Sequence, residues 1–92
     1  MRTSHALLLR LRHDPKYEFS RANVEYVDRG APGDRSRISG DQILHLDQGW
    51  MEIESDLKTK FVPYHRIRRI IYDGVTIWEK SHDNEFPSYA KD

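Results

Sequence analysis

Two short segments of this 92-residue chain hold residue types suited to binding a phosphate group. The first, residues 28–35, places Arg29 and Arg35 on either side of a stretch rich in glycine and proline. Both arginines are candidate phosphate ligands, because a guanidinium offers paired donors that match two phosphate oxygens. Pro32 and Gly33 fit the central positions of a type II turn, which needs a fixed φ and then a positive φ. The sequence therefore predicts an anion-binding loop shaped by Gly30, Pro32, Gly33 and Asp34.

The same loop also fits a structural role. In that interpretation Arg29 or Arg35 pairs with Asp34, and the segment is a rigid connection between two strands. It is neither a Walker loop nor a dinucleotide-binding turn, because the glycine spacing of both motifs is absent.

The second segment, residues 61–70, is interrupted at Pro63, which favours the edge or the end of a strand. Tyr64, His65 and Arg66 follow at the break. A tyrosine can stack on a base, a histidine can donate a hydrogen bond and an arginine can pair with a phosphate. We expect these three side chains to contact the end of a nucleic acid. The alternative is that His65 is a hydrogen-bonded structural residue at the end of the strand.

The chain offers little for metal or nucleophilic chemistry. It has no cysteine, which excludes disulfides, thiolate metal sites and cysteine nucleophiles. Its five histidines include no His-x-x-x-His pair, and neither a Gly-x-Ser-x-Gly elbow nor a His-x-Ser/Thr pair is present. The sequence predicts no cofactor and no metal site, and it favours a binding protein over an enzyme.

The charges balance overall but are segregated along the chain. There are 15 basic and 15 acidic residues, yet residues 38–57 contain five acidic residues and no lysine or arginine, and residues 58–72 contain five basic residues and no acidic one. Two basic stretches separated by an acidic one can fold into one basic face, whose local field matters more than the total charge. A mixed, solvated surface is the alternative.

Neither a membrane span nor a signal peptide is predicted. The longest apolar run, residues 6–9, is far shorter than either requires. The lack of cysteine in so small a domain favours a reducing, cytoplasmic location.

The fold expected to position these segments is α+β. Ser4 can cap a helix over residues 4–14 that carries leucines on one face and ends before Pro15. From residue 24 to residue 80 the hydrophobic period is two, and turn signals recur about every 8–12 residues. This pattern predicts a small antiparallel sheet or barrel of six or seven short strands, near residues 24–29, 35–39, 43–47, 50–54, 60–64, 68–72 and 75–80. We expect one domain over residues 1–80 and a flexible tail over 81–92.

The last two strands are predicted to form a hairpin, because Asp73-Gly74 separates two β-rich runs. Pairing the residues outward from that loop places Arg69 opposite Trp78 and predicts a core face of Ile70, Tyr72, Val75 and Ile77. The Arg69–Trp78 pair could be a surface that stacks a base. The alternative is a covered tryptophan with the arginine lying over it.

In this order and at this separation, the two segments resemble a small archaeal family that also occurs as a module in larger eukaryotic proteins. The matching residues are Tyr26-x-x-Arg29-Gly30-Ala31-Pro32-Gly33-Asp34, Ile38, the run from Val62 to Ile67, Gly74 and Trp78. The resemblance covers roughly residues 5–80, and the family has been proposed to be an RNA cyclic group end recognition domain. It implies binding of RNA 3′ ends, such as those with a 2′,3′-cyclic phosphate, and partnership with RNA-processing or repair enzymes. The site residues that it implies are Arg29, Arg35, Tyr64, His65 and Arg66, with Asp34 holding the loop.

Two other functions remain open at the level of the sequence. One is a protein–protein adaptor, with Trp50, Trp78 and Phe86 as candidate anchors. The other is an enzyme in which His65 takes part in opening a cyclic phosphate.

Overall fold

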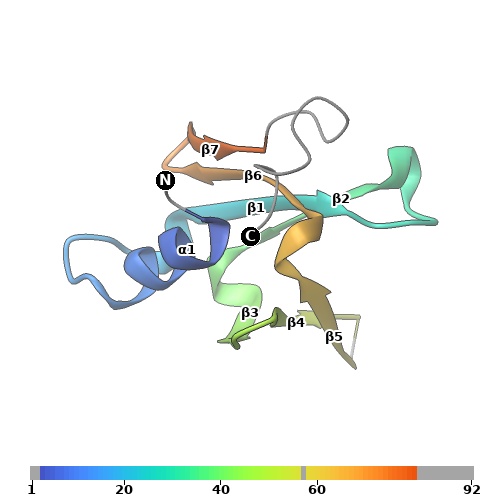
Figure 1. Ribbon diagram of the computed structural model, residues 1–92, viewed down its shortest axis with the longest axis horizontal. Coiled ribbons are helices and arrows are strands. Elements are labelled where there is room, and N and C mark those ends of the chain that lie inside the picture. The colour runs from blue at the N-terminus through green and yellow to red at the C-terminus, as the bar shows by residue number, and fades with distance from the viewer. Residues whose placement is uncertain (1–2, 57, 81–92) are drawn as a thin grey trace.

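One helix and two antiparallel sheets make up the computed structural model, which describes residues 3–56 and 58–80 (Figure 1). A four-stranded sheet has the order β2-β1-β6-β7, and a three-stranded sheet has the order β3-β4-β5. The elements are α1 (Ser4–His13), β1 (Ala22–Val27), β2 (Arg35–Ser39), β3 (Ile43–Leu46), β4 (Trp50–Ser55), β5 (Lys58–Pro63), β6 (Ile67–Tyr72) and β7 (Val75–Glu79). The predicted tail, residues 81–92, lies outside the described residues, as does Phe86.

The predicted α+β fold with seven strands is confirmed, but the barrel alternative is wrong. The chain leaves the four-stranded sheet after β2 through a 3₁₀ turn at Gly40–Gln42. It returns after β5 through a second 3₁₀ turn at Tyr64–Arg66. Because each turn interrupts the ladder of backbone hydrogen bonds, β2 does not pair with β3 and β5 does not pair with β6.

The residue that caps the helix is one position earlier than predicted. The hydroxyl of Thr3, not that of Ser4, caps it by accepting a hydrogen bond from the Ala6 N–H at 3.1 Å. Ser4 is instead buried within the first turn. The helix ends as expected before Pro15, with the Asp14 N–H donating to the Arg10 carbonyl at 2.9 Å.

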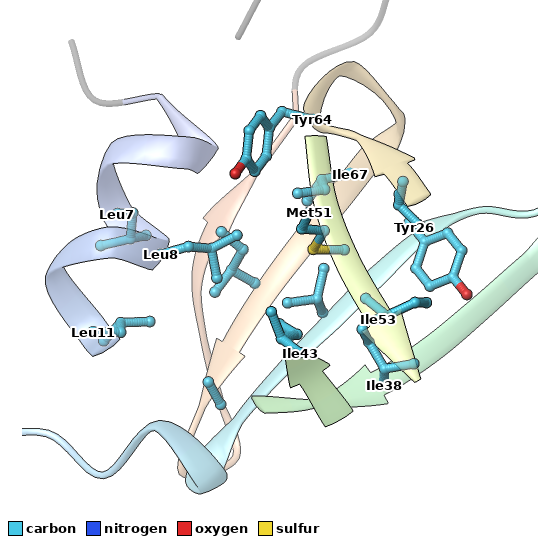
Figure 2. Packing of buried hydrophobic residues seen from close by; sticks show 14 residues of the cluster. Leu7, Leu8, Leu11, Tyr26, Ile38, Ile43, Met51, Ile53, Tyr64 and Ile67 are labelled. Atoms are coloured by element: carbon cyan, nitrogen blue, oxygen red, sulfur yellow. The ribbon is translucent and has the colours of Figure 1, made fainter. Parts of the chain in front are cut away.

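A single core lies between the helix and both sheets (Figure 2). Leu8 and Leu11 of α1 pack into it together with Val24 of β1, Ile70 of β6 and Met51 of β4, all at most 2% exposed. Since one set of apolar contacts joins all three layers, the relative position of the two sheets is fixed by the same burial that stabilises the helix. No helix among the described residues has the length and apolar character needed to cross a membrane.

The predicted hairpin is confirmed at its turn. Asp73 and Gly74 have φ values of 53° and 83°, as the two central residues of a type I′ turn require. Tyr72 lies opposite Val75 and Ile71 opposite Thr76.

Beyond the turn the predicted register is wrong. A bulge at Ile77 adds one residue to β7, so that Trp78 lies opposite Ile70 and Arg69 lies opposite Glu79. Trp78 therefore packs against the core and does not pair with Arg69. The predicted core face fails on this edge strand, because Val75 and Ile77 are 62% and 42% exposed.

Arg69 belongs to a row of alternating charges across the outer face of the four-stranded sheet. Its guanidinium lies 3.7 Å from Glu25 of β1 and 3.5 Å from Glu79 of β7. Glu25 in turn lies 3.7 Å from Arg37 of β2. Opposite charges on directly paired strands support the sheet, so Arg69 has a structural role here.

Gly40 is the glycine that the fold cannot replace. A Cβ at this position would lie 1.8 Å from the backbone carbonyl oxygen of Phe19. We predict that Gly40→Ala lowers the free energy of unfolding by roughly 2–3 kcal/mol, measured by urea denaturation. Gly49→Ala is the matched control, since its Cβ would meet nothing within 4 Å. Equal stability of the two variants would contradict the packing described here.

Candidate functional site

The two segments singled out by their chemistry leave the four-stranded sheet at the same end. Val27, the last residue of β1, pairs with Arg35, the first residue of β2. The neighbouring Tyr26 pairs with Ile67, the first residue of β6. The loop 28–34 and the turn Tyr64–Arg66 therefore adjoin the same end of the paired strands β1, β2 and β6 (Figure 1). The sequence left open whether the segments converge, and the sheet order brings them together.

The loop has the backbone shape that its glycines and proline predict. The Asp34 N–H donates to the Ala31 carbonyl at 2.8 Å, and Gly33 between them has a φ of 68°, as in a type II turn. Gly30 also has a positive φ of 96°. Its N–H donates to the Asp34 carboxylate at 3.2 Å, so that Asp34 ties the two ends of the loop together.

These internal bonds use three of the backbone donors of the loop. The N–H groups of Gly30, Ala31 and Asp34 all donate to acceptors within the loop. The charge available to an anion here comes from the side chains of Arg29 and Arg35, both of which are exposed. Within residues 3–56 and 58–80, neither guanidinium has a hydrogen-bond or ion-pair partner, so the expected pairing with Asp34 does not form.

A polar contact next to the loop joins the two sheets. Lys60 of β5 places its Nζ 2.8 Å from Asp28 Oδ1, and the Ser36 hydroxyl donates to Asp28 Oδ2 at 2.6 Å. The Lys60 hydrogen bond, followed by that of Ser36, lowers the pKa of Asp28, and the same ion pair raises the pKa of Lys60. Lys60 also lies 5.7 Å from the ring centroid of Tyr26, a cation–π contact. The positive charge of Arg66 also lowers the pKa of Asp28, so Arg66 lies near the Asp28–Lys60 ion pair.

The turn Tyr64–Arg66 divides its side chains between the core and solvent. Three residues form one turn of a 3₁₀ helix, so Tyr64 and Ile67 face the same way, and both are buried. His65 and Arg66 are exposed. The side chain of neither has a hydrogen-bond or ion-pair partner within the described ranges. The His65 backbone carbonyl accepts a hydrogen bond from Lys80 Nζ. Its imidazole has no partner among residues 3–56 and 58–80, so it does not fit the alternative of a hydrogen-bonded structural residue.

The prediction that Tyr64 stacks on a base is wrong. Its side chain is 3% exposed and has His5 of α1 stacked on it at 4.2 Å between ring centroids. Its hydroxyl donates to the Asp47 carbonyl at 2.5 Å. Burial, with the nearby Asp47 charge, raises the pKa of Tyr64 to about 12. Figure 2 shows the ring between α1 and the strands, where it anchors the turn.

Trp78 and Arg69 do not belong to this group either, for the reasons given by the hairpin register. Asp28, Ser36 and Lys60, which organise the loop, were not among the site residues predicted from the sequence. Lys60 could have been found from strand alternation, since it lies on the same inward face of β5 as the buried Val62.

The chemistry available here is the binding of an anion. Arg29, Arg35, Lys60 and Arg66 outnumber the carboxylates of Asp28 and Asp34 by two charges. We refer to Arg29, Arg35, His65 and Arg66 as the two-loop site. In the described part of the chain no group of three or more His, Asp or Glu side chains is placed to hold a metal ion.

Comparison with known proteins places the chain in a family. A family model described as the MJ1316 RNA cyclic group end recognition domain matches residues 1–80. UPF0248 protein MK0350 of Methanopyrus kandleri is 32% identical over 68 residues, which cover 74% of this chain and 86% of that protein. A UPF0248 protein of Pyrobaculum calidifontis is 33% identical over 52 residues, covering 56% of this chain and 68% of the relative. No solved structure matches the chain.

The Asp28–Lys60 contact predicts a pH dependence of stability. Because the pKa of Asp28 is lowered in the folded protein, its carboxylate stabilises the fold above pH about 4, and this stabilisation is lost as the pH falls through the folded-state pKa. A raised lysine pKa stabilises it up to pH about 10.5 and is lost above the folded-state pKa. We expect Asp28→Asn to cost about 1 kcal/mol of unfolding free energy at pH 7, a modest value because the ion pair is partly exposed. The cost should be smaller at pH 3, where protonation of the carboxyl group weakens the pair.

Urea denaturation at both pH values measures this difference. Glu54→Gln, a change at an exposed carboxylate of β4, is the control. A cost of Asp28→Asn that is the same at pH 3 and pH 7 would contradict the role of the ion pair.

Proposed function

The chain belongs to the MJ1316 RNA cyclic group end recognition family, and on that premise we propose that it binds RNA 3′ ends that carry a 2′,3′-cyclic phosphate. The two-loop site is where we expect the end to bind. The observation that carries this proposal is that the segments bearing Arg29, Arg35 and Arg66 adjoin the same end of the paired strands β1, β2 and β6, with all three residues exposed.

The charge of the site suits such an end. A cyclic phosphate carries one negative charge, and the phosphodiester before it carries another, which together match the excess of two positive charges around the loop. Both oxygens of the Asp28 carboxylate are bonded to Lys60 or Ser36, and the charge of Lys60 offsets that of Asp28, which reduces its repulsion of a phosphate. His65 can donate a hydrogen bond to the ring oxygens, and the glycine-bearing loop lets Arg29 and Arg35 approach from the other side.

Shape, not charge, has to provide the discrimination. A linear 3′-phosphate carries more negative charge than a cyclic one, so a site that responded to charge alone would prefer the linear end. The loop is fixed by its own hydrogen bonds, and the turn is anchored by buried Tyr64. A rigid site of this kind can favour the compact cyclic group, because little conformational entropy is lost on binding.

The test is fluorescence anisotropy with one short RNA that ends in a hydroxyl, a linear phosphate or a 2′,3′-cyclic phosphate. We predict tightest binding to the cyclic end, with the preference retained when the salt concentration is raised. Equal binding to all three ends that collapses with salt would contradict the proposal, because it would indicate contact with the phosphate backbone only. Recovery of the RNA with its cyclic end opened would instead favour the enzymatic alternative.

Substitutions locate the site in the same assay. Arg29→Ala and His65→Ala should each weaken binding to the cyclic end by about 1–3 kcal/mol, the value of a charge-assisted hydrogen bond. Arg21→Ala is the control, since Arg21 lies near Asp73 at the opposite end of the sheet. If both site variants stay folded and bind like the wild type, the site has been placed wrongly.

A further inference from the structure

Two exposed aromatic side chains lie on β4 and β5, next to the turn that carries His65 and Arg66, but are not part of the two-loop site. Trp50 of β4 and Phe61 of β5 are 45% and 58% exposed. Their rings meet edge to face, with centroids 6.3 Å apart and planes at 85°. In such an arrangement the edge of one ring points at the face of the other, so their mutual contact covers only one of the four ring faces. Exposed aromatic rings offer flat faces on which the bases of a nucleic acid can stack.

Strand pairing connects this pair to the turn that carries His65 and Arg66. Trp50 lies opposite Pro63, the last residue of β5, and Tyr64–Arg66 follows directly. Phe61 is two residues earlier on the same strand, about 7 Å away along it. Both side chains are on the outer face of the three-stranded sheet, because the residues next to them, Met51 and Val62, are buried.

The neighbouring charges indicate which part of an RNA the pair would contact. Glu52 lies opposite Phe61, and Glu54 is next on the same face. Carboxylates repel a phosphate backbone but can accept hydrogen bonds from the amino groups of bases. The surface is therefore suited to bases, while phosphates are suited to the arginines of the two-loop site.

We propose that Trp50 and Phe61 form a stacking platform for the bases that precede the bound RNA end. This inference rests on the proposed function, and it supplies the stacking surface that buried Tyr64 and inward-packed Trp78 do not provide. Val75 and Ile77 are comparably exposed but are aliphatic and offer no ring face to a base. The platform makes binding depend on RNA length as well as on the end group.

The test compares three ligands with the same 2′,3′-cyclic end: a mononucleotide, a trinucleotide, and a trinucleotide whose first two nucleotides lack bases. The two trinucleotides carry the same phosphates, so the ratio of their affinities isolates the contacts of the bases. We expect the complete trinucleotide to bind at least about fivefold more tightly than the abasic one. Trp50→Ala should abolish that ratio and leave the affinity for the mononucleotide unchanged, whereas the control Ile77→Ala should change neither.

The outcomes separate this inference from the proposed function. A ratio that survives in folded Trp50→Ala overturns the platform, even if the cyclic end is recognised. A ratio lost in Trp50→Ala with no preference among end groups supports the platform and contradicts the proposed function. Absence of RNA binding, together with a partner protein or self-association that depends on Trp50, overturns the platform and assigns the surface to protein contacts.

Discussion

The ion pair between Asp28 and Lys60 connects the parts of the molecule that bear on function. Lys60 belongs to the three-stranded sheet, and Asp28 begins the loop that extends from the four-stranded sheet, so their 2.8 Å contact crosses from one sheet to the other. It neutralises a carboxylate that would otherwise oppose an anion. It also leaves Arg29, Arg35 and Arg66 as the exposed cations around the loop. An interaction of modest strength thereby determines the charge that the site presents.

Tyr64 has a comparable effect on the other half of the site. Its buried ring and its hydrogen bond to the Asp47 carbonyl fix the turn against α1 and the connection between β3 and β4. His65 and Arg66 point to solvent because Tyr64 and Ile67 point inward. Tyr64 is thus a positioning residue. The exposed rings that could contact bases are Phe61, at the start of the second segment, and Trp50, which lies on β4 outside both segments.

The features that were predicted correctly from the sequence are those set by interactions between neighbouring residues. The Pro-Gly turn, the Asp73-Gly74 hairpin turn and the end of the helix before Pro15 depend on a few adjacent residues, and all three were predicted correctly. The register of β7 was not, because alternation cannot reveal the extra residue at Ile77. The burial of Tyr64 depends on His5 and Asp47, which are distant in the sequence, and the Asp28–Lys60 contact depends on how two sheets are placed. The family match carries the functional hypothesis further than these patterns alone could.

The most direct test of the central claim, that the two loops form one site for an RNA end, is an amide chemical-shift titration of the labelled protein with a 2′,3′-cyclic mononucleotide. We predict that the largest changes fall together on residues 28–36 and 63–67, with one common dissociation constant. Changes concentrated instead in the pocket between α1 and β3, which is lined by Arg12, His13, His45 and Asp47, would contradict it.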